Sequence, residues 1–255
     1  MTNDRSVREG YPLLWKDKYT VKSYDVDQEK RITLMSLFNC FQESAWHHAE
    51  RCDFGYKSLR EKGKFWVLSR LRIEIDRLLL WEEPFTVETW SKGTQGIFAL
   101  RDFLVIDSGE TAVARAASGW LVIDSEKRRP QRLNEFSETM PFLKDRQALE
   151  GPLERLKAPG IPLHGGRITV DFCDIDLNRH ANSSRYFEWI LNSFPYDTLS
   201  GRRAARFDID FLAESVYGDT ISILIGNPSD DGTYLVSLKR DRDERELCRA
   251  RVGWA

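Results

Sequence analysis

Apolar positions follow two different periods along the first half of the chain. Over residues 32–49 they recur every three or four positions, which predicts an amphipathic helix. Over residues 65–76 apolar and charged side chains alternate, which is typical of a half-buried strand. Three more strand-like runs follow, and the turn Asp107-Ser108-Gly109 separates the last two; they cover residues 85–90, 96–106 and 111–123. The first half is therefore predicted to be a helix followed by antiparallel strands.

The second half repeats this order. A strand over residues 168–172 leads through a loop to a helix over residues 182–199, in which Pro195 predicts a kink or an early end. Four strands are then predicted, at residues 207–211, 220–225, 234–240 and 247–254. A helix followed by antiparallel strands, twice over, indicates an α+β fold rather than a parallel α/β one.

The two halves also match residue by residue when the chain is displaced by 149 positions. Thr33 falls on Asn182, and both residue types are favoured N-caps because a side-chain oxygen accepts a first-turn N–H. The other matches are Thr20-Val21 with Thr169-Val170, Asp25-Val26-Asp27 with Asp174-Ile175-Asp176, Phe38 with Phe187, and Ser44 with Ser193. Chance is the alternative, but an ungapped match favours a duplication. The charged, proline-rich residues 125–166 are predicted to connect the two copies.

Composition and charge exclude several classes of protein. Lys and Arg total 38 against 40 Asp and Glu, so the net charge of −2 does not favour nucleic acid as a partner. A hydrophobic share of 41% with 14 Phe and 8 Trp excludes a disordered chain. No apolar stretch approaches the ~20 residues of a membrane span, and the charged first ten residues do not resemble a secretory signal.

The cysteines fit a reducing compartment, so we predict a cytoplasmic protein. They form no C-x-x-C pair and stand at Cys40, Cys52, Cys173 and Cys248. Cys40, His47, His48 and Cys52 invite comparison with a zinc site, since the last two lie four residues apart. This stretch lies on the predicted core helix and no second ligand pair has the usual spacing, so no metal is predicted.

The loop before the second predicted helix carries a specific motif. Residues 174–182 read Asp-Ile-Asp-Leu-Asn-Arg-His-Ala-Asn, and Tyr186 and Trp189-Ile190-Leu191 follow. This segment closely resembles the D-x-N-x-H-x-N loop of acyl-acyl carrier protein (acyl-ACP) thioesterases. The first half holds segments similar to that family's signature segments, in the same order: Gln42-Glu43, Trp66-Val67-Leu68-Ser69-Arg70, Thr89-Trp90, Arg101-Asp102 and Ser118-Gly119-Trp120. The resemblance extends from about Trp15 to the end of the chain.

The resemblance implies a tandem (double) hotdog fold, in which each copy is a long helix wrapped by an antiparallel sheet. We expect residues 1–124 to form an N-terminal hotdog that binds the acyl chain, 125–166 the connector and 167–255 a catalytic hotdog. The family implies hydrolysis of the thioester between a fatty acyl chain and acyl carrier protein, without a cofactor, which releases free fatty acid and ends elongation. The catalytic residues carried over are Asp176, Asn178, His180 and Glu214.

The chain departs from the plant members of that family in two ways. Some of them carry Cys after the equivalent Glu, whereas this chain has Ser215, so a cysteine nucleophile is not supported. The sequence also shows no plastid transit peptide, so we expect a bacterial-type member.

These residue types suit thioester hydrolysis. A helix N-terminus carries unpaired N–H groups and about half a positive charge, which favours negative charge on the thioester oxygen. We predict that Glu214 and His180 activate a water, that Asn178 orients it or a neighbour, and that Asp176 either orients the group or attacks as a carboxylate. A covalent acyl-carboxylate intermediate stays open. The structural alternatives are a turn capped by Asp176 and Asn178, a core role for His180 and a surface role for Glu214.

The first copy has Glu29 in place of Asn178 and Arg31 in place of His180. The second copy is therefore predicted to carry catalysis and the first mainly to house the acyl chain; the alternative is that the first copy's apolar residues are only its core.

The predicted partner is acyl carrier protein, with no nucleic acid and no membrane, and either a monomer or a homodimer is compatible with the sequence. Two basic clusters are candidates for docking this acidic protein, or else form a solvated edge: Lys127-Arg128-Arg129 with Arg132, and Arg202-Arg203 with Arg206. The competing functions are a hotdog acyl-CoA thioesterase, a hydroxyacyl dehydratase and a non-catalytic acyl-thioester sensor. The pairing of Asn178 with His180 argues against the dehydratase.

Overall fold

The computed structural model describes residues 10–133, 140–199 and 201–255. Its central feature is one ten-stranded antiparallel sheet with the strand order β1-β3-β4-β5-β2-β7-β10-β9-β8-β6. The strands of the first half are β1 (Trp15–Thr20), β2 (Lys64–Ile75), β3 (Pro84–Gln95), β4 (Phe98–Asp107) and β5 (Ala112–Asp124). The strands of the second half are β6 (Leu163–Thr169), β7 (Ala204–Phe211), β8 (Thr220–Ile225), β9 (Tyr234–Arg240) and β10 (Arg245–Trp254).

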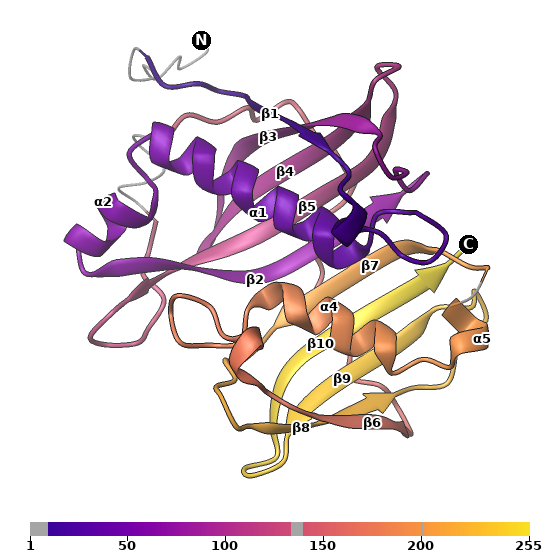
Figure 1. Ribbon diagram of the computed structural model, residues 1–255. Helices are drawn as coiled ribbons and strands as arrows, with labels where there is room; N and C mark the ends of the chain where they lie inside the picture. Colours follow the sequence, from indigo (N-terminus) through magenta and orange to yellow (C-terminus); the bar gives the residue numbers. More distant parts are fainter. Residues whose placement is uncertain (1–9, 134–139, 200) are drawn as a thin grey trace.

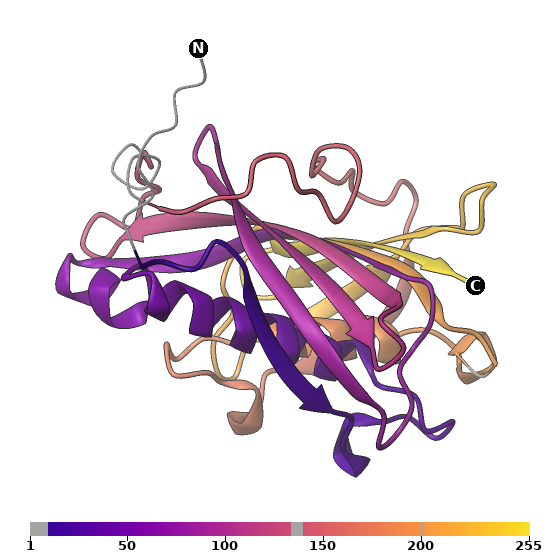
Figure 2. The same cartoon turned by 90° about the horizontal axis from the view of Figure 1, so that it is seen from above.

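Two long helices lie on the same face of this sheet, one over each half (Figure 1). They are α1 (Leu34–Arg51) and α4 (Ser183–Asn192), and each is followed by a short helix, α2 (Tyr56–Glu61) or α5 (Tyr196–Leu199). The connector between β5 and β6 crosses the opposite face (Figure 2). This arrangement is the predicted α+β double hotdog.

The two halves join where β2 pairs with β7. The register places Arg72 opposite Asp208, and their buried side chains form an ion pair with Nε 3.0 Å from Oδ1. A buried ion pair is stable only when further hydrogen bonds satisfy its groups. Arg72 makes these bonds to the connector, since it donates to the carbonyls of Glu150 and Pro152 at 3.1 and 3.0 Å. The ion pair thus ties the two halves and the connector together.

The connector covers the polar face of the central strands. Asp210 accepts a hydrogen bond from the Leu156 N–H at 2.7 Å, and burial raises the pKa of this carboxyl group. On β4, Asp102 accepts the N–H of Ala148 at 2.8 Å. Charged residues that alternate with the core in the sequence therefore bind the connector.

The repeat of 149 residues is visible in the backbone. Thr33 and Asn182 are the N-caps of the two long helices, and their side-chain oxygens accept first-turn N–H groups at 3.2 and 3.0 Å. A 3-10 turn precedes each cap at equivalent positions, η1 (Ser23–Asp25) and η2 (Phe172–Asp174). Identical local structure at this spacing supports a duplication.

The strand predicted over residues 168–172 is wrong at both ends. β6 begins at Leu163, within the segment expected to be the connector, and it ends at Thr169. The chain then turns into η2 because the carboxylate of Asp174 accepts the N–H of Asp171 at 2.9 Å. A local side-chain bond thus overrides the strand pattern.

The two long helices differ in length. α1 has 18 residues and α4 has 10. Pro195 lies three residues beyond α4, and this confirms the predicted early end, because proline cannot donate the next helical hydrogen bond. The last turns of α1, and α2 after them, therefore have no full counterpart in the second half.

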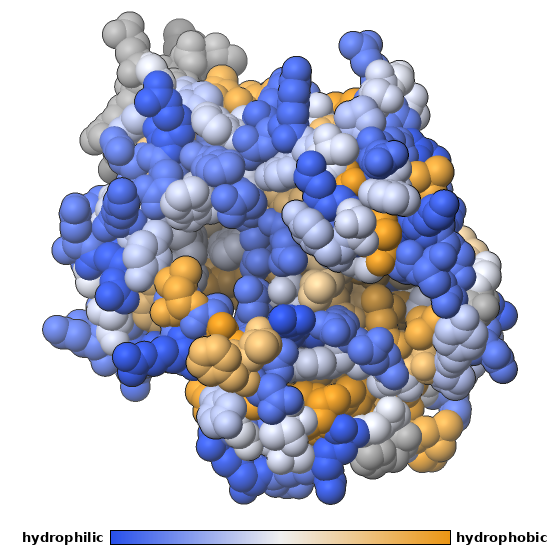
Figure 3. Space-filling view, viewed as in Figure 1, coloured by the Kyte–Doolittle hydropathy of each residue, from blue (hydrophilic) through white to orange (hydrophobic). Residues whose placement is uncertain are grey.

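A single core spans both copies. Phe38 of α1 stacks on Phe187 of α4 with ring centroids 4.8 Å apart, and Phe187 stacks on Phe207 of β7 at 4.7 Å. From the helix side, polar side chains cover most of the surface and apolar ones are visible in a hollow between the halves (Figure 3). Among the described residues, no helix has the length and apolar character needed to cross a membrane.

Candidate functional site

The loop between η2 and α4 is closed by its own aspartate. Asp176 Oδ1 accepts the N–H groups of Asn178 and His180 at 2.8 and 3.3 Å. The Asp176 N–H donates to the His180 carbonyl at 2.8 Å, and Arg179 takes the left-handed conformation with φ 66°. These contacts fix the backbone that carries the side chains of Asn178 and His180.

The first copy builds the same loop without the same chemistry. Asp27 Oδ1 accepts the N–H groups of Glu29 and Arg31 at 3.0 and 2.9 Å, and Lys30 has φ 60°. The aspartate shared by both loops is therefore first of all a turn-forming residue. The residues specific to the second copy are Asn178 and His180.

His180 lies beside Glu214. Its Nε2 is 3.3 Å from Glu214 Oε2, and the Arg128 guanidinium donates to the same oxygen at 2.5 Å. Arg240, at the end of β9, donates to the backbone carbonyl of Glu214 at 3.1 Å. Arg128 at the carboxylate and Arg240 at the backbone thus hold Glu214 next to an imidazole that is 26% exposed.

These residues line a cavity of about 630 Å³, the loop pocket. Asp176, Asn178, His180 and Glu214 all contribute to its wall, so the structure brings the four sequence-predicted residues together. Ser183, the first residue of α4, also lines it, which brings the positive end of the helix dipole to the same place. The opposite wall comes from α1, β2 and β5 of the first copy.

Ser215, next to Glu214, faces the interior of the protein. It is fully buried, and its hydroxyl lies 2.9 Å from that of Tyr186, whose pKa is raised by burial. A side chain at this position therefore packs in the core, which agrees with the absence of a nucleophile there.

Gln42 of α1 belongs to the site, although sequence analysis assigned it only a place in a signature segment. It lines the loop pocket and a smaller neighbouring cavity, and its amide has no hydrogen-bond partner among the described residues. The internal repeat could have identified Gln42, because the equivalent residue of the second copy, 149 positions later, is the apolar Leu191. Gln42 and His180 thus line the same cavity, and the equivalent position of the second copy has no amide.

The neighbouring cavity, the apolar pocket, measures about 200 Å³ and lies between α1, α2 and the strands β2, β4 and β5. Its wall includes Ala45, Trp46, Ala49, Leu59, Ala99 and Leu100. It shares five lining residues with the loop pocket: Gln42, Phe65, Trp66, Trp120 and Asn178. The two cavities therefore adjoin, with two side-chain amides at the junction.

The counterpart of Ala45 shows how the two copies differ at this position. The residue 149 positions later is Phe194, which is buried and packs edge-on against Tyr234 and Trp254 with centroids 5.2 and 5.3 Å apart. A phenyl ring there fills space that a methyl group leaves open in the first copy.

A buried histidine–arginine pair borders the apolar pocket. Arg101 Nη1 lies 2.9 Å from His48 Nδ1, and His48 Nε2 lies 2.7 Å from the Pro12 carbonyl oxygen. The imidazole therefore carries its proton on Nε2 and accepts from Arg101 at Nδ1. Burial, reinforced by Arg101, lowers the pKa of His48 to about 4, and burial lowers the pKa of Arg101 to about 10.

This pair predicts a pH-dependent stability. The unfolded chain takes up a proton on His48 near pH 6.5 but the folded one does so near 4, so stability is full above about 6.5 and is lost as the pH falls toward 4. Proton uptake by His48 in the unfolded chain should therefore lower the free energy of unfolding by about 2 kcal/mol when the pH falls from 7 to 5.

Urea titration at both pH values measures this effect. His48→Gln keeps a donor and an acceptor but does not titrate, so its loss of stability on acidification should be smaller by that amount, whereas His47→Gln should behave like the unmodified protein. Equal losses in the protein and His48→Gln would contradict the prediction.

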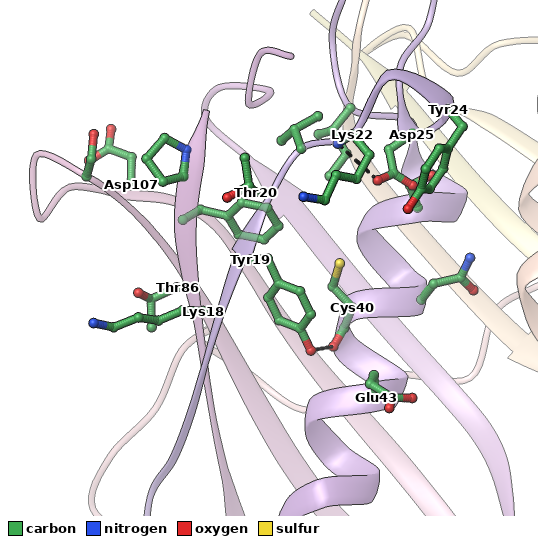
Figure 4. Close-up of a pocket in the computed structure, with 17 residues that line it drawn as sticks. Lys18, Tyr19, Thr20, Lys22, Tyr24, Asp25, Cys40, Glu43, Thr86 and Asp107 are labelled. Carbon is green, nitrogen blue, oxygen red and sulfur yellow. Dashed lines mark hydrogen bonds between the residues drawn. The ribbon is translucent and has the colours of Figure 1, made fainter. Parts of the chain in front are cut away.

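A wider groove of about 770 Å³ lies at the outer edge, between β1 and α1 (Figure 4). The Tyr19 hydroxyl donates to the Cys40 carbonyl at 3.3 Å, and burial raises the pKa of the Cys40 thiol to about 12. This thiol stays protonated, and none of the four predicted catalytic residues lines the groove.

The residues considered for zinc have other partners. His47 Nδ1 lies 2.8 Å from Asp17, and His48 is bound by Arg101 and Pro12. Within the described part of the chain, no group of three or more His, Cys, Asp or Glu residues is placed to hold a metal ion.

The two basic clusters lie at different distances from the site. Arg128 belongs to the site itself, because it binds Glu214 and lies over the Phe65 ring, so the turn that carries it borders the loop pocket. Arg203 lies directly before β7, whereas Glu214 follows that strand. Eight residues of strand separate them by roughly 25 Å.

Comparison with known proteins agrees with this geometry. The family of the acyl-ACP thioesterase N-terminal domain matches residues 12–139, and that of the C-terminal domain matches residues 164–255. The chloroplastic oleoyl-acyl carrier protein thioesterase 1 of Arabidopsis thaliana is 28% identical, over 95% of this chain and 76% of the relative. The corresponding protein of Coriandrum sativum is 25% identical, over 89% of this chain and 66% of the relative. The chain spans about two thirds of the length of the curated relatives that it matches.

Solved structures share the fold. An acyl-ACP thioesterase from Bacteroides thetaiotaomicron is 30% identical and superposes with a TM-score of 0.84, covering 95% of this chain and 98% of that one. The 12:0-ACP thioesterase from Umbellularia californica, at 20% identity and a TM-score of 0.82 over 96% and 98% of the two chains, shows the same fold. Since the two family matches together cover most of the sequence, this chain belongs to the acyl-ACP thioesterase family.

Proposed function

We propose that this chain hydrolyses fatty acyl-ACP and releases a free fatty acid, a reaction that ends acyl-chain elongation. The observation that carries the proposal is the contact of His180 with Glu214 at a helix N-terminus, where the loop pocket adjoins the apolar pocket. The thioester would lie at this junction and the acyl chain in the apolar pocket.

We assign the roles from the contacts. Glu214 orients His180, which accepts a proton from a water as the water oxygen attacks the thioester carbon. The amide of Asn178 donates to the oxyanion, and the positive end of the α4 dipole stabilises its negative charge. The C–S bond then breaks, and His180 returns the proton to the leaving thiolate. Asp176 positions the loop, because Asp27 makes the same backbone bonds in a loop that has no imidazole.

The test is incubation with a panel of acyl-ACPs and acyl-CoAs while free thiol is measured. Release from acyl-ACP supports the proposal, and no release from any acyl-ACP contradicts it. Faster release from acyl-CoA would favour the acyl-CoA thioesterase, and binding without release would favour a sensor.

Gln42 extends the proposed oxyanion site. Gln42→Ala should lower kcat about tenfold to 100-fold with little change in KM, because one hydrogen bond made chiefly in the transition state is lost. Gln42→Glu should lower kcat further, since a carboxylate repels the oxyanion. Asn39→Ala, on the exposed face of the same helix, is the control, and an unchanged kcat in Gln42→Ala would remove Gln42 from the site.

We place carrier docking at the turn that follows β5. Lys127, Arg129 and Arg132 are exposed there and have no carboxylate partner among the described residues, and Arg128 connects this turn to the site. At the other cluster Arg206 is already paired with Asp208 at 2.7 Å. Complementary charge raises the rate of encounter with an acidic protein.

The double variant Lys127→Glu with Arg129→Glu tests this placement. Its KM for acyl-ACP should rise at least about fivefold at low salt, while its kcat/KM for a small acyl-pantetheine thioester stays constant. Arg167→Glu reverses an exposed charge on β6 and serves as the control. A parallel loss with both substrates would indicate damage to the site, and no loss with acyl-ACP would exclude docking here.

The division of labour between the copies is part of the proposal. The first copy would house the acyl chain and the second, which begins with β6 at Leu163, would carry the chemistry, with the segment between β5 and β6 as the connector.

A cytoplasmic location is supported by four free cysteines.

A further inference from the structure

A fourth cavity lies at the position related to the loop pocket by the internal repeat. This twin pocket, of about 320 Å³, is lined by residues 27–29 and 31–34 of the first-copy loop together with residues of α4, α5 and the ends of β7 and β10. The loop pocket is lined by Gln42, and the twin pocket by Leu191, 149 positions later. A tryptophan that follows a glycine also lines each cavity: Trp120 lines the loop pocket, and Trp254 lines the twin pocket. The duplication has thus left two cavities across the two copies.

The twin pocket cannot carry out the same hydrolysis. Arg31 stands where the loop pocket has His180, and its guanidinium is bound by Asp27 and Glu29 at 3.0 and 2.9 Å. An arginine does not exchange protons at cellular pH, and the carboxylates of Asp27 and Glu29 are held in ion pairs with it, so this loop lacks the imidazole base proposed for the loop pocket. The cavity is therefore suited to binding and not to catalysis.

The cavity combines aliphatic lining residues with two arginines that have no carboxylate partner among the described residues. Leu78, Leu191 and Leu199 contribute half-buried aliphatic side chains. Arg202 and Arg203 line the same cavity, and within the described residues neither has a carboxylate at ion-pair distance. Arg203 donates to the Ile75 carbonyl at 2.5 Å, whereas no hydrogen bond of the Arg202 side chain is found in that part of the chain.

The rim of the cavity is closed by contact between the two copies. Gln28 from the first-copy loop and the Tyr196 hydroxyl of α5 form hydrogen bonds at 2.7 and 3.0 Å. A ligand there would contact both copies at once, as we propose for the acyl chain at the loop pocket.

We propose that the twin pocket binds a single-chain fatty carboxylate, with its chain on the leucines and its anionic end at Arg202 and Arg203. An aliphatic chain gains about 0.8 kcal/mol for each methylene removed from water, and a carboxylate matches the planar donors of arginine. The ligand is of the same class as the product of the proposed reaction, but its binding does not depend on hydrolysis.

A photoreactive fatty acid with a diazirine in its chain tests the proposal on the full, unmodified protein. After irradiation, mass spectrometry of peptides should show labels in residues 191–199, at the twin pocket, in addition to residues 42–59, at the apolar pocket. Excess hexadecanoate should suppress both labels, whereas hexadecanol, which lacks the carboxylate, should suppress the label in residues 191–199 much less.

Arg202→Gln supplies the matched variant, because Arg202 is exposed and its side chain forms no hydrogen bond or ion pair with the described residues. It should lower labelling of residues 191–199 about threefold to fivefold and leave that of residues 42–59 unchanged, and Arg167→Gln should alter neither. Absence of label in residues 191–199, or a label that hexadecanoate and Arg202→Gln both leave unchanged, would overturn the proposal. Lack of activity with acyl-ACP would contradict the proposed function but not this result.

Discussion

Replacement of His180 by alanine is expected to lower kcat for acyl-ACP hydrolysis about 100-fold to 10,000-fold, because the proposed general base is lost. KM should change little, since the apolar pocket and the carrier-docking turn are untouched. Free-thiol release under saturating acyl-ACP measures the effect. The physical basis is the 3.3 Å contact of the imidazole with Glu214 in the loop pocket.

The matched control is His47→Ala. His47 lies outside the loop and apolar pockets, where it pairs with Asp17, so its loss should change kcat by less than about twofold. Glu214→Gln should fall between the two, because the amide can still orient the imidazole but carries no charge. Equal activity of His180→Ala and His47→Ala would show that His180 has a structural role.

Replacement of Ala45 by phenylalanine is expected to reproduce in the first copy what Phe194 does in the second. The ring would fill the apolar pocket, so long acyl chains would lose buried methylenes at about 0.8 kcal/mol each. Displacing three methylenes would lower kcat/KM for dodecanoyl-ACP and hexadecanoyl-ACP roughly 50-fold. Butanoyl-ACP, whose short chain does not reach this wall, should be hydrolysed at nearly the original rate.

The ratio of kcat/KM between long and short acyl chains checks this prediction. Asn39→Phe places the same ring on the exposed face of α1 and should leave the ratio unchanged. A uniform loss for all chain lengths would point to a distorted site, and an unchanged ratio would show that the acyl chain lies elsewhere.

The internal repeat made much of this architecture predictable from the sequence. Residues 149 apart share caps, turns and left-handed positions, because each of these depends on a side chain bonding its own backbone nearby. The early end of α4 at Pro195 was predictable for the same local reason. The strand over residues 168–172 was mispredicted because the bond between Asp171 and Asp174 competes with strand pairing.

Comparison of the two loops also separates the candidate residues into one that both copies share and two that only the second copy has. Asp176 has a counterpart with identical contacts, so its role in the turn follows from the repeat. Asn178 and His180 have no such counterpart, since the first copy has Glu29 and Arg31 at these positions, and this contrast identifies them from the sequence alone.

By itself, the sequence determined the α+β class, the duplication, the family resemblance and the second copy's candidate residues, because these depend on period, composition and short-range bonding. The tertiary structure decided which distant groups meet. Arg128 and Gln42 reach the loop pocket from the first copy, and the connector covers Asp208 and Asp210 on the sheet's outer face. It also decided that Ala45 leaves a cavity where Phe194 fills one, because packing depends on all neighbours at once.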